Sequence, residues 1–342
     1  MKRSQVALLA VAVAASLHGV ARAGPFEDGV EAQQNGDYAT ALRLWRPLAD
    51  KGSPVAEYDV GLLYAYGLGA PRDLAAAAAW YRRAAESGEI DAQANLGAAY
   101  ANGWGVAQDY AEAVKWDREA IAHGNVQAKF NLGTLYARGL GVPKDARQAV
   151  MWYRAAATGG NAEAQANLGL MYAEGSGVTP DDRAAVAWYR KAAAQGNAAG
   201  QFNLGLMYEA GRGTALDYGQ ARAWYAKAAD QGLAAARLNI GTLYARGLGS
   251  PRDPAAAAAW YRQAADQGDT QAQINLGLMY EQGDGLAQDY VQAHRWLNLA
   301  AGSEGDPELR DKAAKARDAV AARMTPMQIA EAQRLARNAP SR

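Results

Sequence analysis

The residue types that most often carry chemistry are sparse in this chain, and their spacing does not assemble a catalytic or metal site. There is no cysteine, and the three histidines, His18, His123 and His294, lie far apart in the sequence. No His-Glu-x-x-His segment and no cysteine pair offers zinc ligands. No Gly-x-Ser-x-Gly turn presents a nucleophilic serine, although a hydrolase stays open as a remote alternative. The sequence therefore predicts a protein that is not an enzyme, with no cofactor and no metal.

Two recurring features resemble binding or catalytic motifs but are better explained by local structure. Gly-x-Gly loops such as Gly139 to Gly141 have the look of a phosphate cradle. They recur without a preceding strand, so we interpret them as turns in which glycine takes positive φ after a helix. An aspartate follows each loop and is expected to cap the next helix rather than to serve in acid-base catalysis. These aspartates are Asp73, Asp109, Asp145, Asp181, Asp217, Asp253 and Asp289.

All these features repeat with a period of 36 residues, and this period defines the architecture. A glycine recurs at Gly61, Gly97, Gly133, Gly169, Gly205, Gly241 and Gly277, with a tyrosine three residues later each time. A tryptophan recurs at Trp80, Trp116, Trp152, Trp188, Trp224, Trp260 and Trp296. A fixed period of this length indicates a repeat array in which each unit buries its core against its neighbours. The prediction is an all-α solenoid of antiparallel helix hairpins.

Each repeat contains two helical patterns separated by the glycine loop. In the first, residues 162–175, apolar residues lie on two stripes, which is typical of a helix buried on more than one side. In the second, alanines flank the tryptophan, as at Ala149, Trp152 and Ala156. We expect the small residues to let two helices approach while the indole fills the space between them.

The two ends of the chain depart from the repeat and divide it into four segments. Residues 1–23 resemble a signal peptide, with an apolar run and an Ala-x-Ala cleavage site ending at Ala23. Residues 24–52 are predicted to form an N-terminal capping hairpin, residues 53–302 seven tandem repeats, and residues 303–342 C-terminal capping helices and a tail. We expect export to the periplasm, with secretion as the alternative, and no membrane insertion after cleavage.

The repeated sequence pattern resembles that of a known family. It reads A-x-x-N-L-G-x-x-Y-x-x-G-x-G-V-x-x-D-x-x-x-A-x-x-W-Y-x-x-A-A-x-x-G and covers roughly residues 37–301. This pattern resembles the Sel-one-like repeat (SLR), a relative of the tetratricopeptide repeat. The resemblance implies a right-handed superhelix whose first helices line a concave face, used as a scaffold or adaptor for other proteins. One cysteine-rich branch was reported to bind penicillins, and its framework does not transfer to a chain without cysteine.

Two sets of residues are candidates for contact with a partner. The resemblance implies that a recurring asparagine can face the groove and bind a peptide, whereas the alternative is a bond within or between hairpins. These asparagines are Asn95, Asn131, Asn167, Asn203, Asn239 and Asn275. Positions that vary between repeats are the second set, and they include Phe130 and Phe202 as apolar contacts and Arg138 and Arg246 as charged ones. The phenylalanines could equally fill core space.

The net charge does not indicate a class of partner, so we infer that class from the repeat architecture. Lys plus Arg equals Asp plus Glu at 35 each, which argues against nucleic acid as a partner. The favoured hypothesis is a scaffold of the cell envelope that binds an unidentified protein or peptide on its concave face. The alternative is a protein that binds envelope glycan or exopolysaccharide through exposed Trp104 and neighbouring tyrosines.

Overall fold

The computed structural model describes residues 24–338, and over this range the chain is all α-helix, with no strand. The first helices are α1 (Pro25–Gln34), α2 (Tyr38–Asp50), α3 (Pro54–Tyr66), α4 (Leu74–Glu86), α5 (Ile90–Asn102) and α6 (Tyr110–Ala122). The next are α7 (Val126–Arg138), α8 (Ala146–Thr158), α9 (Ala162–Glu174), α10 (Asp182–Ala194), α11 (Ala198–Ala210) and α12 (Tyr218–Asp230). The last are α13 (Ala234–Arg246), α14 (Pro254–Ala265), α15 (Thr270–Gln282), α16 (Tyr290–Ala301), α17 (Pro307–Ala321) and α18 (Pro326–Arg337).

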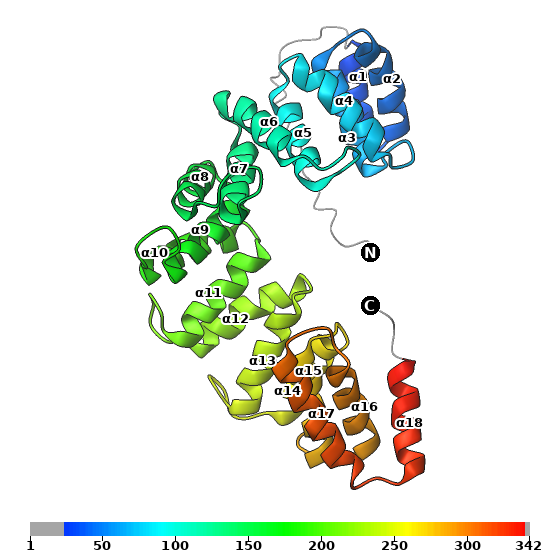
Figure 1. Cartoon of the computed structure of the whole chain (residues 1–342), viewed down its shortest axis with the longest axis vertical. Helices are drawn as coiled ribbons and strands as arrows, with labels where there is room; N and C mark the ends of the chain where they lie inside the picture. The colour runs from blue at the N-terminus through cyan, green and yellow to red at the C-terminus, as the bar shows by residue number, and fades with distance from the viewer. Residues whose placement is uncertain (1–23, 339–342) are drawn as a thin grey trace. The chain divides into compact units, whose positions relative to one another are not determined.

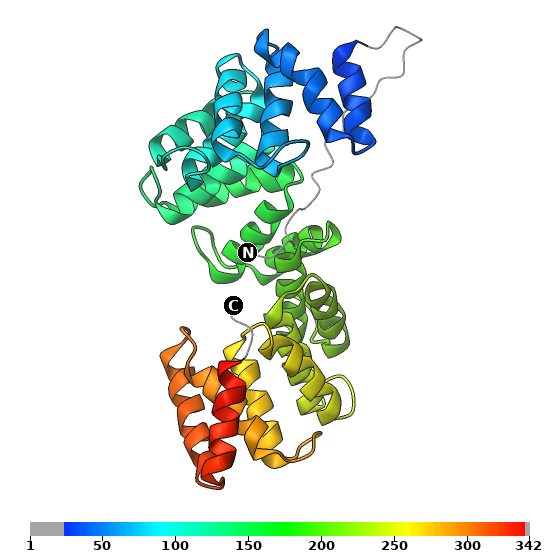
Figure 2. The same cartoon turned by 90° about the vertical axis from the view of Figure 1, so that its right-hand side faces the viewer.

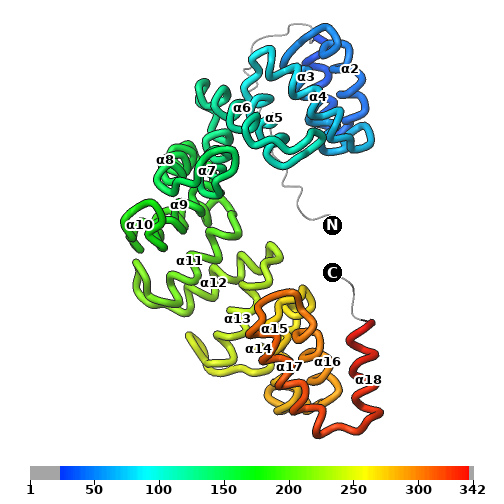
Figure 3. Tube along the Cα trace, viewed as in Figure 1, coloured from blue at the N-terminus to red at the C-terminus, as the bar shows by residue number. Residues whose placement is uncertain are grey.

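The helices pack in chain order within two units, residues 24–120 and 121–338. We call the first helix of each repeat the A helix (α3, α5, α7, α9, α11, α13, α15) and the second the B helix (α4 to α16, even numbers). From α7 to α17 each helix packs on the next, and the A helices α9 and α11 also touch (Figures 1 and 3). This is the helix-hairpin stacking of a solenoid.

The loops and caps follow from residue types inside one repeat. Asp145 precedes α8, and its side chain accepts hydrogen bonds from the backbone N–H groups of Arg147 and Gln148 at 2.8 and 3.1 Å. The other six recurring aspartates accept equivalent bonds. At the end of α9, Gly175 has φ of 72°, a conformation that other residues rarely adopt. The predicted aspartate caps and glycine turns are therefore confirmed.

The glycine inside each A helix has a packing role. A Cβ atom on Gly169 would lie 2.7 Å from the ring of Tyr189, which belongs to the B helix of the same repeat. The same clash would occur at Gly61, Gly133, Gly205 and Gly241. Glycine is required here because the tyrosine ring lies directly on the A-helix backbone.

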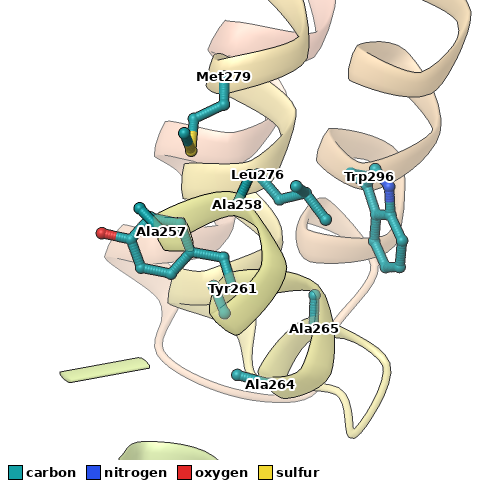
Figure 4. Packing of buried hydrophobic residues seen from close by; sticks show 9 residues of the cluster. Ala257, Ala258, Tyr261, Ala264, Ala265, Leu276, Met279 and Trp296 are labelled. Atoms are coloured by element: carbon teal, nitrogen blue, oxygen red, sulfur yellow. The ribbon is translucent and has the colours of Figure 1, made fainter. Parts of the chain in front are cut away.

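The buried aromatic residue of the second unit is this tyrosine, not the tryptophan beside it. Tyr189 and Tyr225 are 2% and 0% exposed. By contrast, Trp188 and Trp224 are half-buried, and each packs against a core cluster formed by the preceding B helix and its own A helix. The expectation that the indole fills the gap between helices therefore holds only in part in these repeats, because the tyrosine takes the fully buried position. It holds at the ends, where Trp80 and Trp296 are buried. Figure 4 shows the cluster around Tyr261, with Leu276 and Trp296 contributed by the next repeat.

Arginines on the B helices join consecutive repeats. Arg154 on α8 donates a hydrogen bond of 2.7 Å to the Tyr172 hydroxyl on α9, 18 residues later. The same bond joins Arg46 to Tyr64, Arg82 to Tyr100, Arg190 to Tyr208 and Arg262 to Tyr280. Because each bond spans two hairpins, it fixes the recurring tyrosine of one repeat to its predecessor.

Helices outside the seven repeats lie at both ends of the described range. At the N-terminal end α1 packs on α2 and α2 on α3, and Trp45 donates its indole N–H to the Phe26 carbonyl at 3.1 Å. At the C-terminal end α17 and α18 both pack on α16 (Figure 2). Thr325 and Gln328 form the predicted capping box before α18. The predicted signal segment, residues 1–23, lies outside the described residues.

Candidate functional site

The candidate site is a stripe of side chains along each A helix of the second unit, which we call the A-face. On α9 it comprises Glu163, Asn167, Leu170 and Glu174, spaced four, three and four residues apart. That spacing places them on one side of the helix. Glu163, Leu170 and Glu174 are exposed, and Asn167 is half-buried. The stripe is thus the side of α9 that no neighbouring helix covers.

All six recurring asparagines lie half-buried at this position of their A helices. The Asn131 amide oxygen accepts a hydrogen bond from Gln127 at 3.0 Å, and Asn275 accepts one from Gln271 at 2.7 Å. In the first unit, the Asn95 amide donates to the Tyr58 hydroxyl at 3.5 Å. These amides have partners within the protein while their helix side remains open. Their position is compatible with both the internal role and the peptide-binding role that the sequence left open.

The B-helix tyrosines place a hydroxyl beside this stripe. Tyr153 donates to the Thr134 hydroxyl at 3.2 Å, and Thr134 donates to the Phe130 carbonyl at 3.1 Å. Burial raises the pKa of the Tyr153 phenol, and hydrogen bonding with Thr134 and Asn167 opposes the rise. The phenol is therefore a neutral hydrogen-bonding group, not a base.

Arg138 and Arg246 occupy equivalent places three repeats apart. Both are exposed, at the C-terminal ends of α7 and α13, and neither forms an ion pair within residues 24–338. Each lies near a buried phenol, Tyr153 or Tyr261, whose pKa it lowers slightly against the larger effect of burial. Two unpaired guanidinium groups on the A-face could therefore meet carboxylates of a partner.

Phe130 and Phe202 are half-buried and pack inward. Phe130 contacts the Tyr153 ring with centroids 5.8 Å apart, and Phe202 contacts Tyr225 at 5.6 Å. Both rings belong to the edges of core clusters. The structure thus places these residues in the packing role that the sequence considered as an alternative to partner contact.

Seven consecutive stretches of the chain match the model of one family, described as the Sel1 repeat. They are residues 54–89, 90–125, 126–161, 162–197, 198–233, 234–269 and 270–303. Together they cover well over half of the sequence. The chain belongs to the Sel1 repeat family. The resemblance inferred from the 36-residue pattern is thereby confirmed.

Similar solved structures include two proteins, of which the first agrees with this membership. A Sel1 repeat protein from Oxalobacter formigenes is 29% identical, with 88% of this chain and 97% of that one covered and a TM-score of 0.63. Protein c5321, a protective antigen of uropathogenic Escherichia coli with an SLR fold, is 31% identical, with 91% and 82% covered and a TM-score of 0.46. The comparison with curated proteins gives no significant match. Sel1 repeats generally form a non-catalytic scaffold that mediates contacts between proteins.

Sequence reasoning missed the apolar part of the A-face of this Sel1 array. Leu170 on α9 and Leu206 on α11 are 40% and 37% exposed, on two helices that touch each other. They lie at the same repeat position as Thr134 and Thr242. Leucine also occupies this position at Leu62 and Leu278, which pack against core clusters, so the sequence alone did not distinguish the exposed leucines.

The remaining groups of the Sel1 array do not assemble a reactive site. Within residues 24–338 no three His, Cys, Asp or Glu side chains are grouped to hold a metal ion. No helix of this range is long and apolar enough to cross a bilayer. His294 is buried in α16, where burial, and then the nearby Arg317, lower its pKa. His123 is exposed at the end of the α6 region.

Proposed function

We propose that this Sel1 repeat protein is a non-enzymatic scaffold of the cell envelope that binds a polypeptide segment of another protein on the A-face of its second unit. The export signal read from residues 1–23 supports the location. The general role of Sel1 repeats supports the class of partner. The asparagines of the stripe supply side-chain amides for hydrogen bonds with a peptide backbone.

The observation that carries this proposal is the order of side chains across the A helices. Arg138 lies on α7, Leu170 and Leu206 lie on α9 and α11, and Arg246 lies on α13. The leucines offer an apolar centre, and the arginines offer a charge on either side of it in chain order. Leu170 and Leu206 are exposed beside each other's helices, and contact with a partner would remove this apolar surface from water.

Site-specific crosslinking tests this proposal. A photoreactive residue at position 206 should capture one envelope protein, whereas the same residue at position 187, exposed on the B helix α10, should not. Capture should fall at least about tenfold in the double variant Arg138→Glu and Arg246→Glu, because each change replaces attraction by repulsion. Arg183→Glu on α10 makes the same change in net charge as either single arginine variant and should leave capture unchanged.

The proposal fails if position 187 captures the same protein as efficiently, or if the arginine variants capture it like the wild type. One observation favours the glycan alternative: the Trp104 side chain is 52% exposed in the loop after α5. Aromatic side chains of this kind stack on sugar rings. Retention of envelope polysaccharide by the wild type but not by Trp104→Ala, with no crosslinked protein, would favour that function instead.

A further inference from the structure

A surface hollow lies on the B-helix side of the second unit, away from the A-face residues. It has a volume of about 590 Å³ and is formed by α8 and the loop that follows α9. Its lining includes Arg147, Val150, Met151, Arg154, Ala155 and Val178. The loop is held close to α8, since a Cβ on Gly177 would lie 2.3 Å from the Ala146 carbonyl oxygen. The hollow is therefore built by tight backbone packing.

The floor of the hollow is apolar for a reason particular to this repeat. Met151 is 47% exposed, and the equivalent residues of the other repeats are alanine, lysine or arginine. Those residues are Ala79, Lys115, Ala187, Ala223, Ala259 and Arg295. Thr158, also in the lining, stands where three other repeats carry an acid, namely Glu86, Asp230 and Asp266. An exposed thioether beside Val150 and Val178 gives a flexible apolar contact surface.

Two arginines on α8 border this floor. Arg147 and Arg154 are both exposed, neither forms an ion pair within residues 24–338, and no acidic residue lines the hollow. They are seven residues apart, which separates their backbone positions by about 10 Å along the helix at ~1.5 Å per residue. Arg154 is held in place by its bond to Tyr172. An oriented guanidinium with free N–H groups is suited to binding a carboxylate.

We propose that this hollow binds an acidic polypeptide segment that places an apolar side chain between two carboxylates. The apolar side chain would lie against Met151 and Val178, and the carboxylates would accept hydrogen bonds from Arg147 and Arg154. The charge of the lining selects an acidic segment over a basic one. This surface uses none of the A-face residues, so it is a second binding site whose occupancy does not depend on the first.

Selection from displayed random peptides of about twelve residues, with the full mature chain as the target, tests the proposal. The enriched peptides should carry an apolar residue flanked by acidic ones. One enriched peptide is then labelled and its affinity measured by fluorescence anisotropy at two salt concentrations. Arg147→Ala and Met151→Ala should each weaken binding about tenfold, the usual effect of removing one charged contact or one apolar anchor.

Control variants distinguish binding in the hollow from binding on the A-face. Arg183→Ala removes an arginine at the position equivalent to Arg147 in the next repeat and should change the affinity less than about twofold. The double variant Arg138→Glu and Arg246→Glu of the A-face should also leave this peptide bound. The proposal is overturned if no peptide is enriched over the double variant Arg147→Glu and Met151→Glu, if the enriched peptides lack acidic residues, or if Arg183→Ala weakens binding as much as Arg147→Ala.

Discussion

Asp59 is the residue whose replacement gives the sharpest test of the packing in the first unit. It lies on α3 at the repeat position that asparagine occupies in the other six repeats. Its side chain is half-buried, and burial, followed by repulsion from Glu89, raises its pKa from 3.8 to about 7. A carboxylate thus occupies the position at which the other repeats have the neutral amide of asparagine. Asp59→Asn should stabilise the first unit at neutral and alkaline pH.

The magnitude follows from linkage between protonation and folding. Between the unfolded pKa of 3.8 and the folded pKa of about 7, the unfolded chain releases the proton first, so stability falls as the pH rises. The free energy of unfolding falls by ~1.36 kcal/mol per pH unit, which gives a loss of at most about 4 kcal/mol. The loss is complete above about pH 7. A half-buried side chain can turn partly toward water, so we expect Asp59→Asn to regain about 2 kcal/mol at pH 8 and little at pH 4.

Hydrogen exchange of the α3 backbone amides at these two pH values measures the effect locally, which suits an array in which repeats open separately. Asn95→Asp makes the reverse change on the next A helix and should destabilise α5 at pH 8. Glu89→Gln should lower the pKa of Asp59, read from its carboxyl carbon resonance, because the second cause of the shift is removed. Equal protection gains at pH 4 and pH 8 in Asp59→Asn would refute the reasoning.

Three further changes test other parts of the array. His294→Val should reduce acid sensitivity of the C-terminal helices in pH-dependent melting, because the lowered pKa of His294 costs stability as the pH falls through 6.5 and then through the folded value. Tyr225→Ala should cost about 3 to 5 kcal/mol in urea unfolding, and Trp224→Ala about half of that, since the tyrosine is fully buried and the tryptophan half-buried. Asp145→Ala should cost about 1 kcal/mol and fray the start of α8 in hydrogen exchange, because two N–H groups lose their acceptor.

The features that sequence predicted well are those set inside a single repeat. The cap at Asp145 needs only an acceptor two and three residues before the amides it serves. The turn at Gly175 needs only a residue that tolerates positive φ. Because the pattern recurs every 36 residues, the interpretation of one hairpin applies to all seven. For this reason the all-helical repeat architecture and the family were accessible from the sequence.

The features that sequence did not predict depend on contacts between elements. Trp188 and Tyr189 are neighbours of similar size, and only the position of Gly169 on the facing A helix decides that the tyrosine is buried. The raised pKa of Asp59 depends on burial by neighbouring elements and then on Glu89, 30 residues further along the chain. The Arg154 to Tyr172 bond depends on the stacking of two repeats. Regular spacing of 18 residues between such arginines and tyrosines was nevertheless a usable signal.

In a repeat array, a position that all repeats share serves the stacking that all repeats need, so recognition of a partner must come from the positions that differ. By that argument the shared asparagines are weaker candidates than Arg138 and Arg246, whose position carries a different residue in each of the other five repeats. Met151 differs from its equivalents in the same way, but on a B helix. Because A and B helices present different sides of each hairpin, we expect substitutions on one side to leave the proposed binding on the other side unchanged.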